Sequence, residues 1–165
     1  MLKLLGSALI LAAGISARTL QVCALRRELS VLREMAAALD GMQNDIRIGR
    51  LPLPRLLQKA GVGRRAEVRS FFSAVQQGIA GGRSLPETWR AACEKLPLPL
   101  RQREAAAEVG SCFCGDEEAA CKGILLAKEE LERALRDGMQ RQADREKRDT
   151  ALCLSASALL IILLM

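Results

Sequence analysis

The stretch LRRELSVLREMAAALDGMQNDI, residues Leu25–Ile46, decides the fold. Its apolar residues recur at alternating steps of four and three, which is the period of one face of an α-helix. The members of this stripe are Leu25, Leu29, Leu32, Ala36, Leu39, Met42 or Gln43, and Ile46. Neither Pro nor Gly interrupts the stripe before Gly41. The stretch therefore predicts one long amphipathic helix that continues to about Ile48 and packs one face against other helices.

The residues before this stretch form an uncharged segment, Leu4–Ala17, which follows Lys3. Three interpretations of the segment are open: a secretory signal peptide cleaved near Ala12–Gly14, a soluble hydrophobic helix, or a retained membrane helix. The helical pattern runs straight on from the segment, whereas a signal peptide is normally followed by a turn or an extended stretch. We therefore favour a retained membrane helix over residues 1–17.

The chain ends on a second uncharged segment, ALCLSASALLIILLM, residues 151–165. A C-terminal segment is not a signal peptide, so its hydropathy predicts a tail anchor. Segments of 14 and 15 residues reach about 21–22 Å as helices, and a hydrocarbon core is about 30 Å thick. Flanking Lys and Arg side chains that extend along the acyl region to the headgroups close this gap.

Cations flank both segments mainly on the side of the intervening chain, with Arg18 after the first and Arg145, Lys147 and Arg148 before the second. The positive-inside rule then places residues 18–150 in the cytoplasm and both termini outside. The expected domains are two membrane helices, 1–17 and 151–165, and one cytoplasmic helical bundle, 18–150.

The bundle is expected to hold further helices between breaks at Gly and Pro clusters. The patterns predict helices over about 52–60, 64–78, 84–94 and 100–113, with Ile79–Arg83 as a loop. Ser84 and Asp116 are predicted N-caps, and Ser84 with Glu87 matches a capping box. The fold class is all-α, a bundle of about six helices.

The last predicted helix runs from about Glu117 to Arg148 and into the apolar tail. We expect it to pack antiparallel to the first helix as a stalk that rises from the membrane, with the four shorter helices capping the far end. Its predicted apolar face is Cys121, Ile124, Leu125, Lys128, Leu131, Leu135 and Met139.

Aromatic residues are scarce, with one Trp and three Phe among 165 residues. The core must therefore be built mainly from Leu, Ala, Val and Cys, and Phe71, Phe72 and Trp89 are its expected large anchors. Substitution at these three positions should cost the most stability.

The composition excludes several classes of function. With no His, the chain lacks a Ser-His-Asp site, a Cys-His site and an imidazole metal ligand. Nucleotide-binding, zinc-protease and hydrolase motifs are also missing, so we predict neither an enzyme nor a cofactor. Nucleic acid is not an expected partner, because no groove-reading motif is present. The six Cys lack metal-site spacing and are read as small apolar residues in a reducing compartment.

Positive charge concentrates in residues 47–69, where Glu67 is the sole acid. The basic residues of this segment are Arg47, Arg50, Arg55, Lys59, Arg64, Arg65 and Arg69. One interpretation is a solvated surface that keeps the domain soluble. The other is a binding face for an acidic protein surface or for anionic lipid headgroups, and these seven residues are the candidate partner-binding site.

Several ordered motifs resemble the stage III sporulation protein AB family of endospore-forming bacteria. They are Met1–Gly6 before an apolar helix, the Leu25–Ile46 stripe, Gly49–Pro54 followed by Leu56–Leu57, Ser84–Trp89, the Asp116–Glu118 helix start and the apolar tail. Members of that family look like the cytoplasmic helical domain of type II secretion and type IV pilus inner-membrane platform proteins.

The resemblance implies a structural component of a mother-cell channel complex in sporulation, at the mother-cell membrane, beside other channel-complex membrane proteins. It implies that the chain docks a secretion-type ATPase, for which the basic segment is a reasonable face. The alternative is a regulatory adaptor at the membrane surface that binds anionic lipid or a soluble signalling protein.

Overall fold

The computed structural model describes the backbone of residues 2–49 and 51–164 and the side chains of residues 22–49, 51–144 and 148. The described chain is all-α, as predicted, and contains no strand. Its six helices are α1 (Leu2–Arg47), α2 (Leu53–Gly61), α3 (Ala66–Ala80), α4 (Leu85–Cys93), α5 (Leu100–Cys112) and α6 (Glu117–Leu164). The helix breaks fall at the Gly and Pro clusters, although Ile79 and Ala80 belong to α3 rather than to the following loop.

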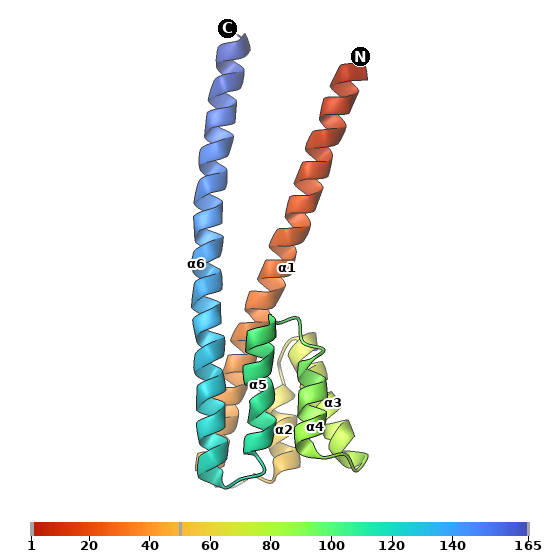
Figure 1. Ribbon diagram of the computed structural model, residues 1–165, viewed down its shortest axis with the longest axis vertical. Coiled ribbons are helices and arrows are strands. Elements are labelled where there is room, and N and C mark those ends of the chain that lie inside the picture. The colour runs from red at the N-terminus through yellow and green to blue at the C-terminus, as the bar shows by residue number, and fades with distance from the viewer. Residues whose placement is uncertain (1, 50, 165) are drawn as a thin grey trace.

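The long helices α1 and α6 pack antiparallel, as expected (Figure 1). Gln43 donates a hydrogen bond from Nε2 to the Cys121 carbonyl at 3.3 Å, and Asp40 pairs with Lys128. Farther toward the N-terminus, Leu29 packs closely on Gly138. Residues with lower numbers in α1 therefore contact residues with higher numbers in α6, as in any antiparallel pair. Both chain termini lie at one end of the molecule, here called the proximal end, and the opposite end is the distal end.

The four short helices run up and down beside the distal part of the α1–α6 pair (Figure 1). The expectation that they cap the far end of the stalk is therefore wrong. Each helix packs on the next along the chain, and α6 returns to α1, so the bundle closes into a ring around one core. Amphipathic helices with one apolar side bury that side best in this arrangement, because every helix then faces the shared core.

The predicted N-caps have different outcomes. Asp116 accepts a hydrogen bond on Oδ1 from the Ala119 N–H at 2.7 Å, which confirms it as the cap of α6. Ser84 stands at the N-cap of α4 but makes no side-chain cap bond, so the predicted capping box is wrong. Proline at position 86 removes one of the two N–H groups that an N-cap side chain normally reaches. The Ser84 carbonyl instead accepts from the Thr88 hydroxyl at 2.8 Å.

The three predicted core anchors lie buried and touch one another. The Phe71 and Trp89 ring centroids are 5.0 Å apart, and Phe72 lies 6.1 Å from Trp89. The indole N–H of Trp89 donates to the Ala106 carbonyl at 2.8 Å, so the one polar atom of this side chain is satisfied. Phe113 adds a fourth ring, 5.6 Å from Trp89. This aromatic cluster joins α3, α4 and α5.

The buried face of α6 differs from the predicted one. Leu125 and Met139 were expected inside and are exposed. The face consists largely of small residues and two large anchors: Ala120, Ile124, Ala127, Leu131 and Gly138. Small side chains let α1 approach closely, so the contact does not need the longest apolar residues of the helix. The remaining large apolar side chains of α6 are left partly open to solvent.

Among the described residues, no helix has an apolar run long enough to cross a bilayer. The side chains of the predicted membrane segments, 1–17 and 151–165, lie outside the described residues. The three-domain division stays a prediction. The backbone of α1 is continuous from Leu2, so the N-terminal segment and the stripe share one helix.

Candidate interaction site

The basic segment follows α2 from one end of the bundle to the other. Arg47 ends α1 and Arg55 lies in the first turn of α2, both at the distal end. Arg64 lies in the connection between α2 and α3 and Arg69 in the first turns of α3, both toward the proximal end. Arg50 lies outside the described residues. The predicted site is therefore a band along one edge of the bundle and not a compact cluster.

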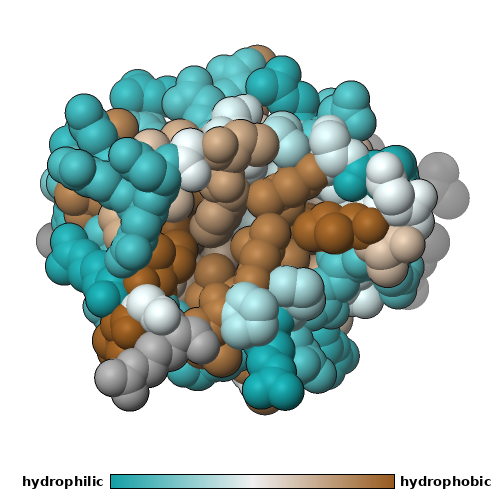
Figure 2. All heavy atoms as spheres, turned by 90° about the horizontal axis from the view of Figure 1, so that it is seen from below, coloured by the Kyte–Doolittle hydropathy of each residue, from teal (hydrophilic) through white to brown (hydrophobic). Residues whose placement is uncertain are grey.

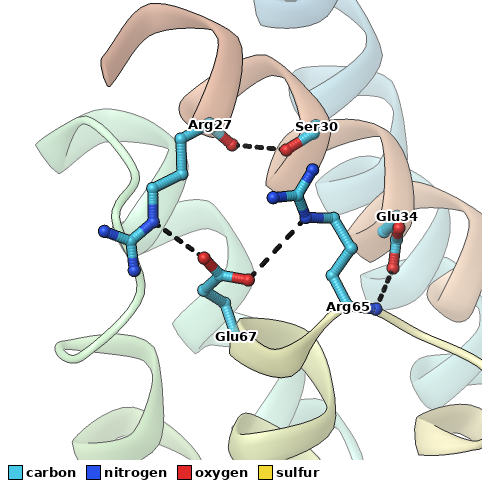
Figure 3. Close-up of polar contacts among 5 residues, drawn as sticks. All are labelled: Arg27, Ser30, Glu34, Arg65 and Glu67. Atoms are coloured by element: carbon cyan, nitrogen blue, oxygen red, sulfur yellow. Dashed lines mark hydrogen bonds and ion pairs between the residues drawn. The ribbon is translucent and has the colours of Figure 1, made fainter. Parts of the chain in front are cut away.

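Two cations of this band have partners within the chain. Lys59 Nζ lies 2.7 Å from the Asp45 carboxylate of α1. Arg65 Nε lies 3.8 Å from Oε2 of Glu67, whose Oε1 accepts from Arg27 Nε at 2.7 Å (Figure 3). These intramolecular pairs compete with any external acidic partner for the same cations.

The pairs around Glu67 form a clamp between α1 and the start of α3. The Arg65 backbone N–H, at the N-cap position of α3, donates to Glu34 Oε2 at 2.6 Å (Figure 3). A backbone hydrogen bond, with a further contribution from the Arg27 guanidinium, lowers the pKa of Glu67 below its ordinary value. Glu67 is thus charged at neutral pH and holds two arginines from different elements. Sequence reasoning counted Glu67 only as an isolated acid and missed Glu34.

The other four described cations of the band make no hydrogen bond or ion pair through their side chains within the described part of the chain. They are Arg47, Arg55, Arg64 and Arg69. Arg64 is half-buried and the rest are exposed. A guanidinium that is exposed and unpaired keeps its full set of donors for a carboxylate or phosphate. Of the described cations in the predicted band, these four are therefore available to bind another molecule.

A second feature, which sequence reasoning missed, lies at the distal end. Seen from that side, a band of apolar residues crosses the middle of the molecule and polar residues surround it (Figure 2). The apolar residues at the distal ends of α1 to α4 are the partly buried Ile46, Leu53, Ile79 and Leu85 and the exposed Ile48 and Leu51. We call these six residues the distal apolar surface. They come from three places in the sequence, so no local pattern marks them.

The described residues offer little for catalysis. They contain no group of three or more His, Cys, Asp or Glu placed to hold a metal ion. A hollow of about 660 Å³ lies between α4 and α5, lined partly by Cys93, Glu94 and Arg103. Burial raises the pKa of the Cys93 thiol to about 12, so the thiol stays protonated and is a poor nucleophile. The one thiol that lines the hollow is therefore not activated.

Three comparisons relate the chain to known proteins. A family model described as Stage III sporulation protein AB matches residues 3–165. Stage III sporulation protein AB of Bacillus subtilis (strain 168) is 29% identical over 171 aligned positions that cover 100% of both chains. A solved structure of a Stage III sporulation protein AB superposes with a TM-score of 0.65 at 25% identity, covering 72% of this chain and 98% of that chain. Both names describe sporulation proteins and neither states an enzymatic activity.

Proposed function

Because the chain belongs to the stage III sporulation protein AB family, we propose that it is a membrane-anchored structural component of a secretion-like channel complex. In this role it acts as a platform in the mother-cell membrane and docks a secretion-type ATPase on its cytoplasmic bundle. Other membrane proteins of the complex and the surrounding lipid are its further partners.

The observation that carries this proposal is the register of the α1–α6 pair. Gln43 meets Cys121 and Asp40 meets Lys128 near the distal end, and Leu29 meets Gly138 farther along. When this antiparallel register is followed toward the termini, Ala17 stands at the level of Ala151. The two apolar segments then occupy the same layer, as two anchors in one membrane require.

A platform also needs a body that holds its shape while other parts move. The bundle meets this need with a closed ring of helices, a four-ring aromatic cluster and the Glu67 clamp. Among the described residues the buried Cys93 thiol is held protonated, and no group of His, Cys, Asp or Glu is placed to hold a metal ion. A structural role fits the described bundle better than a chemical one.

Binding between the purified full chain in lipid nanodiscs and the secretion-type ATPase of the same organism tests the proposal. We expect saturable binding that weakens as salt is raised, because the unpaired cations of the band contribute to it. Glu in place of Arg55 or Arg69 should weaken binding, whereas Arg90→Glu on α4, also exposed, should not. No binding by a wild-type chain that retains its helical signal would refute ATPase docking.

One observation favours a second candidate, a membrane-surface adaptor that binds anionic lipid. Arg64 and Arg69 lie toward the proximal end, the side that faces the bilayer if the apolar segments are anchors. Anionic headgroups attract cations that come within about a Debye length of the membrane surface. The affinity for the ATPase is therefore measured in nanodiscs that contain phosphatidylserine and in nanodiscs that lack it. Equal affinities in the two kinds of nanodisc would contradict the adaptor role.

A further inference from the structure

The distal apolar surface is produced by the up-and-down path of the chain. α1 and α3 end at the distal end, while α2 and α4 begin there (Figure 1). Two of the three connections at this end, 48–52 and 81–84, are short, and their described residues are exposed. Gly49 and Gly82, with φ of +66° and +79°, make the sharp turns that bring these helix ends together. The apolar side chains at four helix ends consequently form one surface.

The exposure of this surface is not explained by the fold alone. Ile48 is 64% exposed and Leu51 36% exposed, next to four partly buried apolar neighbours. Single exposed apolar residues are common on soluble proteins, but contiguous apolar patches rimmed by polar residues mark interaction sites. Figure 2 shows this arrangement, with apolar residues in the centre and hydrophilic residues around them.

Exposed charged residues of both signs lie at the distal ends of the helices, next to the surface. On the side of α1 to α3 lie the exposed cations Arg47, Arg55 and Arg83, none of which forms an ion pair within the described residues. On the side of α4 and α6 lie the exposed acids Glu87, Glu117 and Glu118. An interface with an apolar centre and separated charges on its rim selects both partner and orientation.

The position of the surface limits what covers it. Both termini lie at the proximal end, so under the proposed topology the distal end points away from the bilayer and lipid does not reach it. Two copies anchored in one membrane point the same way, so their distal ends do not meet face to face. A water-soluble protein approaching from the cytoplasm meets this surface first.

We propose that the distal apolar surface is the main docking surface for the soluble ATPase partner, an inference that rests on the proposed function. The partner presents an apolar patch flanked by carboxylates that face Arg47, Arg55 and Arg83, and by a cation that faces the start of α6. The apolar centre supplies the affinity, and the basic band along α2 supplies steering and orientation.

Binding of the ATPase to nanodisc-embedded full-length variants tests this surface. Ile48→Asp and Leu51→Asp should each raise the dissociation constant by at least about 10-fold, since truncating or charging a residue at the centre of an interface typically weakens binding by that factor. Two exposed apolar residues away from the distal end provide controls, Val62→Asp at 71% exposure and Leu126→Asp at 59%. Both controls should bind within about 3-fold of wild type.

Two results separate the possible failures. If the wild-type chain does not bind the ATPase, the proposed function fails and this surface with it. If wild type binds and the Ile48 and Leu51 variants bind equally well, the distal surface is overturned while ATPase docking stands. Ile48→Ser removes the apolar contact without adding charge, so it is a milder variant in case Ile48→Asp fails to fold. An unchanged Trp89 emission spectrum shows that the core of each variant is intact.

Discussion

Replacing Gly110 with alanine tests how rigidly the aromatic cluster is held. Gly110 lies in α5 against Trp89, and a Cβ added there would meet the Trp89 Cβ at 2.7 Å and Cγ at 2.8 Å. Ordinary contacts between such carbon atoms are about 3.5–4.0 Å. The indole is unable to retreat freely, because its N–H is bonded to the Ala106 carbonyl and its ring contacts Phe71.

Two opposing terms set the sign of the effect. Alanine is favoured over glycine inside a helix by about 1 kcal/mol. Overpacking a tight core typically costs about 1–3 kcal/mol. Because the indole of Trp89 is held by its own contacts, we expect the cost of Gly110→Ala to lie in the upper part of that range. We therefore expect Gly110→Ala to lower the free energy of unfolding by about 1–2 kcal/mol, which corresponds to a drop in Tm of about 2–8 °C.

Gly41→Ala is the matched control. Gly41 also lies inside a helix, α1, but a Cβ there would meet nothing within 4 Å. Only the helix-propensity term remains, so this variant should gain about 0.5–1 kcal/mol. Thermal unfolding of both full-length variants in detergent, followed by far-UV circular dichroism and Trp89 fluorescence, measures the difference. If Gly110→Ala is stabilised as much as Gly41→Ala, the aromatic cluster yields easily and the reasoning is refuted.

Three further predictions concern polar groups and thiols. The Glu67→Gln variant should have a lower Tm than wild type at pH 7. This difference in Tm should shrink as the pH falls through the lowered pKa of Glu67, because protonation then removes the same charge from wild type. Parallel Tm curves for the two proteins from pH 7 to pH 3 would contradict this. Gln43→Glu places a carboxyl in a buried position and should lower the free energy of unfolding by more than Gln43→Leu does. The loss for Gln43→Leu should stay within about 1.5 kcal/mol, and urea titrations of the two variants measure both losses. Cys93 should resist N-ethylmaleimide in the folded chain while Cys23 and Cys114, both exposed, react, and mass mapping that finds Cys93 labelled first would show that α4 opens readily.

The helices were predictable because their signals are local. The stripe from Leu25 to Ile46 fixes the inward face of α1, and every member of it is buried or partly buried. The Asp116 cap follows from neighbours within one turn. Such signals depend on helix geometry alone, which the chain carries in its own spacing.

The buried side of α6 was not predictable in the same way. Leu125 is a better apolar residue than Ala127 by any hydropathy scale, yet Leu125 is exposed and Ala127 is buried. The close approach of α1, seen where Leu29 packs on Gly138, decides which side is buried, and only the three-dimensional packing contains that distance.

The candidate site depends even more on long-range placement. From the sequence, all seven basic residues within 47–69 were equally good candidates for binding a partner. The fold removes Lys59 and Arg65 from that set by pairing them with Asp45 and Glu67, the first of them 14 residues away in sequence. Counting charge along a sequence finds neither the Lys59–Asp45 pair nor the distal apolar surface, since both arise where separate helices meet.

The polar contacts between α1 and α6 connect this packing to the proposed anchoring. A seam built mostly from Ala and Leu tolerates sliding, because a shift by one turn, about 5.4 Å, replaces small apolar residues with similar ones. The Gln43 bond to the Cys121 carbonyl and the Asp40–Lys128 pair are lost on such a shift. A one-turn slip would also move the apolar ends apart in level by a quarter of their roughly 21 Å length, which two short anchors in one bilayer tolerate poorly. The same polar contacts therefore set the register of the bundle and the common level of its two apolar ends.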